Sequence, residues 1–67
     1  MYIINEYQTN GNSTAVVTPA TEENEHAALS IFHARCSSAA VSQVAKHTVT
    51  IETDEGFQVD RKCFLHG

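Results

Sequence analysis

The first alternating stretch of the chain predicts a β-hairpin. Residues 2–9 mix β-forming residues with polar ones, and residues 13–18 alternate again. Between them stands Asn10-Gly11-Asn12. An Asn-Gly pair between β-rich runs is a strong short-range hairpin signal, because both residues tolerate a positive φ angle. Pro19 is expected to end the second strand, since its backbone nitrogen has no proton to donate.

A helical pattern follows Pro19 and is expected to end near Ser42. Thr18 before Pro19, or Thr21 before two glutamates, can serve as the N-cap. Apolar and small residues at helical spacing predict a core-facing stripe: Leu29, Phe32, Cys36, Ala39 and Ala40. A second strip lies nearly opposite: Ala27, Ile31, Ala34 and Val41. Its small side chains would let another helix approach closely, which favours a helix-mediated dimer. An exposed alanine-rich face is the other interpretation.

Residues 44–53 and 57–66 alternate with a period of two and predict a second hairpin. Asp54-Glu55-Gly56 is a three-residue loop between them, with Gly56 at the position of positive φ. The predicted order is ββαββ, an α+β fold with one helix packed on an antiparallel four-stranded sheet. The predicted core comprises Leu29, Phe32, Cys36, Ala39, Val49, Ile51, Val59 and Leu65.

The length of the second loop also predicts a register. Thr53 should face Phe57, which makes His47 and Cys63 cross-strand neighbours on the face that the helix covers. The same register turns Phe64 outward, and an aromatic side chain there favours contact with another subunit. Together with the second helical strip, this predicts a set of interface residues: Ile31, Ala34, Val41 and Phe64.

Cys36 also points at the helix-covered face, so that two thiols and the imidazole of His47 could converge. A metal site would need His33 or His66 as a fourth ligand, and no C-x-x-C or H-x-x-x-H pair supports it. A Cys63 nucleophile activated by His47 would need a cleft and an oxyanion site, for which so short a chain has little room. Simple packing is preferred, because free cysteine behaves as a small hydrophobe. His33, His47 and His66 stay candidate ligand-binding residues, since protonated imidazole binds anions; no catalytic residue, metal or cofactor is predicted.

The length and composition of the chain restrict the number of domains, the size of the core and the classes of partner that it can bind. The 67 residues form one domain, 1–67, and its two tyrosines, three phenylalanines and absent tryptophan make a thin core. Domains this short are marginally stable alone, which favours a homodimer or a larger assembly. A net charge of −4 argues against direct nucleic-acid binding. Neither a membrane-spanning run nor a signal peptide is expected, and two cysteines suit a reducing cytoplasm.

Several segments, spread over nearly the full length of the chain, carry a resemblance. They are Met1-Tyr2-Ile3-Ile4, His33, the run at 38–44, His47, Gly56 and Cys63-Phe64-Leu65-His66. On these residues the chain resembles a group of short proteins encoded by phages and prophages of Gram-positive gut bacteria. The resemblance implies an origin and not an activity.

These observations predict a non-enzymatic phage accessory protein that acts as a homo-oligomeric binding module in the cytoplasm of the infected bacterial host. It would bind a host protein or sequester a small ligand, for instance to inhibit antiviral defence. The alternative is a virion-assembly or tail-associated structural protein, and a small metal- or thiol-dependent enzyme is a third hypothesis. The first is favoured by small size, the lack of a catalytic set and the apolar surface on the helix and last strand.

Overall fold

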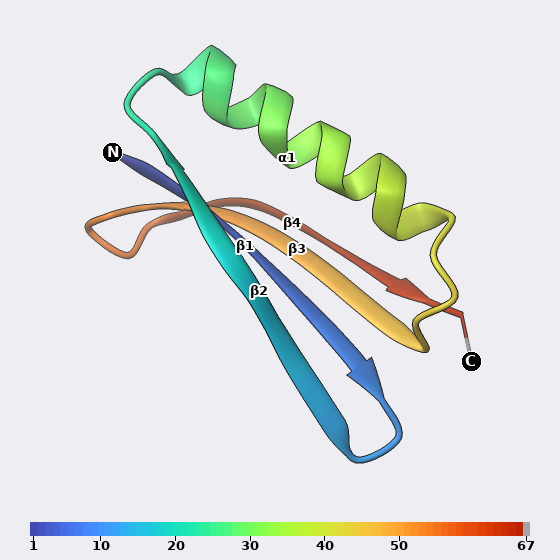
Figure 1. The fold of residues 1–67 in the computed structure, drawn as a ribbon. Coiled ribbons are helices and arrows are strands. Elements are labelled where there is room, and N and C mark those ends of the chain that lie inside the picture. The colour runs from blue at the N-terminus through green and yellow to red at the C-terminus, as the bar shows by residue number, and fades with distance from the viewer. Residues whose placement is uncertain (67) are drawn as a thin grey trace.

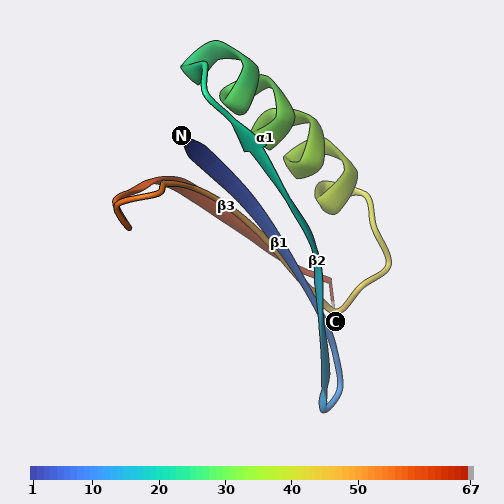
Figure 2. The same cartoon turned by 60° about the vertical axis from the view of Figure 1, so that its left-hand side comes forward.

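Two β-hairpins joined by one helix make up the chain (Figure 1). A computed structural model gives residues 1–66, so that Gly67, the last residue of the predicted domain, lies outside the described residues. The elements are β1 (Tyr2–Asn10), β2 (Ser13–Glu22), α1 (Glu25–Ala40), β3 (Lys46–Thr53) and β4 (Gln58–Leu65). The strands form one antiparallel sheet in the order β2-β1-β3-β4, with α1 on one side of it (Figure 2). The predicted α+β architecture is confirmed.

The first hairpin turns where the sequence predicts, but β2 is longer than expected. Asn10 pairs with Ser13, and Gly11 takes a φ of 59° in the two-residue loop. Pro19 does not end β2, which continues to Glu22. Because β2 is an edge strand and its register with β1 shifts at this point, the ladder does not need a backbone N–H from proline.

The longer β2 moves the start of the helix. Thr18 and Thr21, the two predicted N-caps, lie within β2. The observed N-cap is Asn24, whose side-chain oxygen accepts a hydrogen bond from the backbone N–H of Ala27 at 3.2 Å. This bond satisfies one of the N–H groups that the first helical turn leaves without a partner. At the other end α1 stops at Ala40, two residues before the predicted end.

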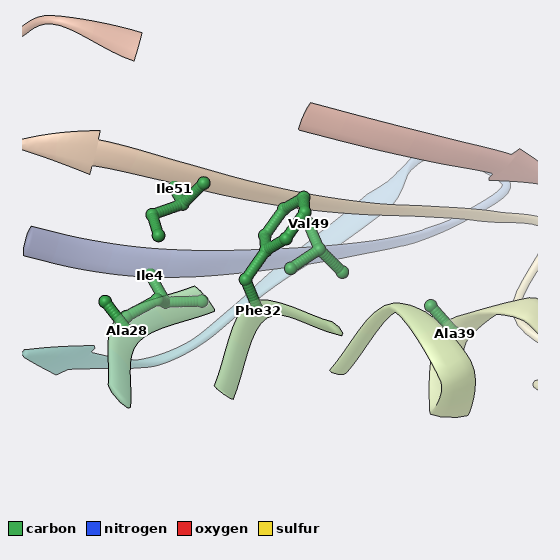
Figure 3. Packing of buried hydrophobic residues seen from close by; sticks show 6 residues of the cluster. All are labelled: Ile4, Ala28, Phe32, Ala39, Val49 and Ile51. Atoms are coloured by element: carbon green, nitrogen blue, oxygen red, sulfur yellow. The ribbon is translucent and has the colours of Figure 1, made fainter. Parts of the chain in front are cut away.

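The core lies between α1 and the two central strands. Its fully buried apolar residues are Ile4, Ala28, Phe32, Ala39, Val49 and Ile51. Phe32 is the largest of them and projects from α1 onto the sheet beside Val49 (Figure 3). The predicted core was right for Phe32, Ala39, Val49 and Ile51, while Leu29 and Cys36 are only partly buried at its margin.

Two of the predicted core residues are exposed, because β4 contains a β-bulge. The loop is as predicted, since the Thr53 N–H donates to the Phe57 carbonyl at 2.8 Å and Gly56 has a φ of 90°. Glu52 then pairs with Gln58, but Ile51 pairs with Asp60, which leaves Val59 as the extra residue. Val59 and Leu65 are 39% and 70% exposed.

The bulge also makes the predicted register wrong by one residue. His47 pairs with Phe64, and Cys63 pairs with Thr48. Because side chains alternate between the faces of a sheet, a one-residue shift exchanges the faces of all following β4 residues. Phe64 therefore lies on the α1 side and packs against the core, and Cys63 lies on the opposite side, called here the open face.

Candidate functional site

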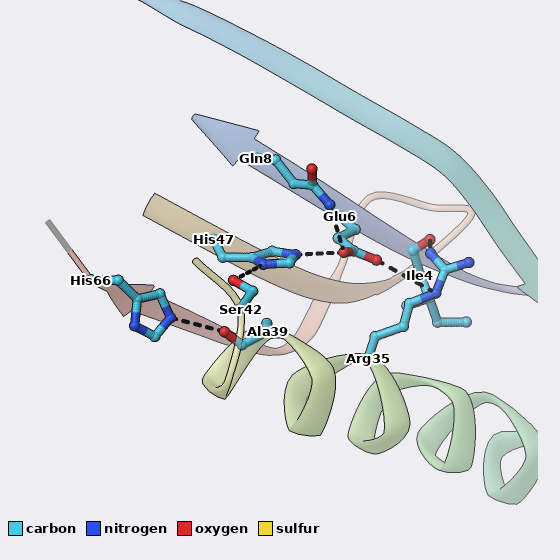
Figure 4. A network of polar contacts seen from close by, with 8 residues as sticks. All are labelled: Ile4, Glu6, Gln8, Arg35, Ala39, Ser42, His47 and His66. Carbon is cyan, nitrogen blue, oxygen red and sulfur yellow. Dashed lines mark hydrogen bonds and ion pairs between the residues drawn. The ribbon is translucent and has the colours of Figure 1, made fainter. Parts of the chain in front are cut away.

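A buried polar network near the C-terminal end of α1 is the main cluster of chemically active side chains (Figure 4). Glu6 comes from β1, His47 from β3 and Ser42 from the loop after α1. His47 Nε2 lies 2.5 Å from a carboxylate oxygen of Glu6, and its Nδ1 lies 2.9 Å from the Ser42 hydroxyl. Both contacts are satisfied when Nε2–H donates to Glu6 and the serine hydroxyl donates to Nδ1.

Two further side chains complete the surroundings of Glu6. Arg35 Nε from α1 lies 3.9 Å from Glu6 Oε1, and the same guanidinium donates to the Ile4 carbonyl at 3.4 Å. Gln8 Nε2 donates to Glu6 Oε2 at 3.4 Å. A buried carboxylate is tolerable only when it is paired and hydrogen-bonded. Over residues 1–66 every buried side-chain nitrogen or oxygen has a partner.

The order Ser42, His47 and Glu6 matches the residue types of a serine-based catalytic triad, which sequence reasoning missed. The hydrogen bonds are those of such a triad, but the imidazole is closed to a substrate and no oxyanion donor within residues 1–66 accompanies it. His47 is 3% exposed, and the Ser42 backbone N–H donates to the Ala39 carbonyl at 3.3 Å instead of pointing at a developing oxyanion. The role that accounts for these contacts is structural: they hold the C-terminal end of α1 against β1 and β3.

The predicted convergence of Cys36, His47 and Cys63 does not occur. Cys63 is exposed on the open face, where the Thr48 hydroxyl donates to its sulfur at 3.2 Å. Cys36 is half-buried on α1, and burial, reinforced by the Asp60 carboxylate, raises the pKa of its thiol. No three His, Cys, Asp or Glu side chains among the described residues are grouped to hold a metal ion.

The three candidate ligand-binding histidines have separate partners and do not define one site. His33 is exposed, with its ring edge-on to Phe32 at a centroid distance of 5.4 Å. His66 Nε2 lies 2.9 Å from the Ala39 carbonyl, one of the last acceptors of α1, and its ring stacks on Phe64. A histidine that caps a helix C-terminus is a common arrangement, but the strand register was needed to find it.

The four predicted interface residues differ in their exposure to solvent. Ala34 and Val41 are exposed, Val41 by 82%, whereas Ile31 and Phe64 are half-buried and pack against the core. The outward placement of Phe64 was therefore wrong. A role for these four residues in subunit contact stays a prediction.

The acidic clusters at 22–25 and 54–55 share one neighbour. The α-amino group of Met1 lies 3.7 Å from Glu23 and 3.6 Å from Asp54. Met1 also lines a hollow of about 290 Å³ together with Thr21, Glu22, Glu23 and Asn24. One carboxylate of each cluster thus lies within ion-pair distance of the same amino group.

Comparisons with protein-family models, curated proteins and solved structures found no significant match to this chain. Across the described residues, no helix has both the length and the apolar character needed to cross a membrane.

Proposed function

We propose that the chain is a non-enzymatic binding module that acts as a homo-oligomer. Its partner is a host protein or a small ligand, and inhibition of host antiviral defence is the role that suits this activity in a phage accessory protein. The phage setting is supported by the resemblance of the sequence, and the binding role by the surface of the sheet.

The exposure of β4 carries the proposal. Every residue of β4 is exposed except the half-buried Phe64. Three large apolar side chains at this edge of the sheet are accessible: Phe57 by 70%, Leu65 by 70% and Val59 by 39%. Phe57 and Val59 lie beside the hairpin loop and Leu65 at the far end of β4, so that they offer separate apolar contact points along this edge. With α1 covering only one face of the sheet, β4 and the open face are the surfaces available to partners (Figure 2).

Binding experiments with matched variants test the proposal. Wild-type protein, a Leu65→Asp variant and a Val16→Asp control would be immobilised and exposed to infected host lysate. Leu65 and Val16 are both exposed, on opposite edge strands. The proposal expects an identified host protein or small ligand that binds purified wild-type and Val16→Asp chains with defined stoichiometry and is lost with Leu65→Asp.

The other outcomes separate the alternatives. Specific retention of virion proteins would indicate an assembly or tail-associated role instead. A chain that is monomeric at all concentrations and retains neither kind of partner would overturn the proposal.

A further inference from the structure

The outer edge of β4 differs from the outer edge of β2. In β2 the register shift beside Pro19 interrupts the strand near its middle, and irregularities of this kind protect edges from pairing. In β4 the bulge at Val59 lies next to the hairpin loop. The segment from Asp60 to Leu65 is therefore a regular, exposed edge strand at the end of the sheet.

The hydrogen-bonding pattern fixes which β4 residues can pair outward. The His66 N–H donates to the Ala45 carbonyl at 2.7 Å, so that this pair is of the hydrogen-bonded type. Hydrogen-bonded and non-hydrogen-bonded pairs alternate in an antiparallel ladder. The backbone N–H and C=O groups of Arg61, Cys63 and Leu65 consequently point away from β3.

We infer that a second copy of the chain pairs with this edge, β4 antiparallel to β4, with the two-fold axis at Cys63. The inference rests on the homo-oligomer of the proposed function and names its interface. In this register Cys63 pairs with Cys63 of the second copy, and Arg61 of each copy pairs with Leu65 of the other. These three pairs form about six backbone hydrogen bonds. A two-fold contact of this kind is closed and joins two sheets into one of eight strands.

Charge selects this register among the neighbouring ones. With the axis at Cys63, the Asp60 carboxylate lies opposite His66 of the second copy, both on the α1 side of the sheet. Lys62 then lies opposite Phe64, whose ring can cover its aliphatic stem. An axis at Lys62 or at Arg61 would instead place each of these cations opposite its own copy, which is destabilising.

Cysteine cross-linking tests the register directly. In a hydrogen-bonded pair the two Cα atoms lie about 5.5 Å apart, within the roughly 4.4–6.8 Å that a disulfide spans. The Cys36→Ser chain, which retains Cys63, should form a covalent dimer with dibromobimane, a short thiol-bridging reagent. The matched Cys63→Ser chain, which retains Cys36 on α1, should not.

A mixing experiment determines the register of the β4–β4 pairing to within one residue. In the Cys36→Ser/Cys63→Ser background, Arg61→Cys and Leu65→Cys chains should each fail to cross-link alone and should cross-link when mixed. Slowed amide exchange at Arg61, Cys63 and Leu65 with rising protein concentration would support the same edge without any substitution.

Sedimentation equilibrium separates the failure of this inference from that of the proposed function. A dimer in solution without Cys63 cross-linking or protected edge amides would overturn the inference and leave the homo-oligomer intact. Loss of that dimer on Ala34→Glu substitution would place the contact on α1 instead. A monomer at every concentration would overturn this inference together with the homo-oligomer of the proposed function, and the binding of a host partner would then be decided by the lysate experiment alone.

Discussion

At the scale of single residues, Glu6 joins three parts of the chain. Its carboxylate contacts His47 of β3, Arg35 of α1 and Gln8 of β1. Because the group is buried, its charge depends on these partners for the stabilisation that water would otherwise give. Arg35 and His47 would in turn lose their shared acceptor if Glu6 were removed.

A Glu6→Ala substitution should lower the free energy of unfolding by about 3 kcal/mol, because it leaves the guanidinium and imidazole without their acceptor. Glu6→Gln keeps a neutral acceptor for His47 and should cost less. Urea unfolding followed by circular dichroism measures both. Glu55→Ala, in the exposed hairpin loop, is the control and should change stability by at most about 0.5 kcal/mol. Equal effects of Glu6→Ala and Glu55→Ala would show that the network contributes nothing.

The thiol of Cys36 gives a pH-dependent prediction. Burial, then the Asp60 carboxylate, raises its pKa in the folded chain. The folded state therefore keeps the thiol proton to higher pH than the unfolded state does. This contribution to stability is fully present below the ordinary thiol range and is lost as pH rises through the raised pKa.

Alkylation by iodoacetamide measures this difference, because only the thiolate reacts. In a Cys63→Ser chain, the rate at Cys36 should rise at higher pH in the folded protein than in the same chain unfolded by urea. Mass spectrometry between neutral and alkaline pH gives both profiles. Coincident profiles, after allowance for the slower access of a half-buried group, would contradict the prediction.

At the scale of elements, the start of α1 depends on one side chain. Asn24→Ala should cost about 1 kcal/mol of stability, since the Ala27 N–H loses its acceptor. Thr21→Ala is a matched control, because threonine was the predicted cap but lies in β2. The urea concentrations at the unfolding midpoints of the two variants show which of the two residues caps α1. A larger loss with Thr21→Ala would indicate that the helix begins earlier.

At the scale of the whole molecule, a core of six fully buried residues, two of them alanines, must hold the chain together. Domains of this size bury only about 60% of the surface that the unfolded chain exposes. Association through β4 would add backbone hydrogen bonds and bury Leu65. The folded state should then depend on protein concentration.

The melting temperature should accordingly rise with concentration, because a dimer that dissociates on unfolding gains about 1.4 kcal/mol per tenfold increase in concentration. Differential scanning calorimetry over two decades of concentration measures it, and Leu65→Asp should flatten the dependence. A melting temperature that is constant over this range would mean that the monomer is stable alone.

The sequence by itself determined the order of elements, because the signals for it are local. Gly11 and Gly56 occupy the two turns where positive φ is needed, and period-two and helical patterns mark the segments between them. Most of the core followed from the same patterns, since Phe32, Val49 and Ile51 are apolar residues on the predicted inner faces of their elements and are fully buried.

Only the tertiary structure decided the register of β4 and the composition of the polar site. Both faces of β4 mix apolar with charged residues, so that its pattern favours neither register, and the bulge at Val59 selects one. Glu6 and Arg35 are charged and would be expected at the surface from sequence alone. They lie at the helix–sheet contact because the fold brings β1 and α1 together there, and the opposite charges of Glu6 and Arg35 then form an ion pair.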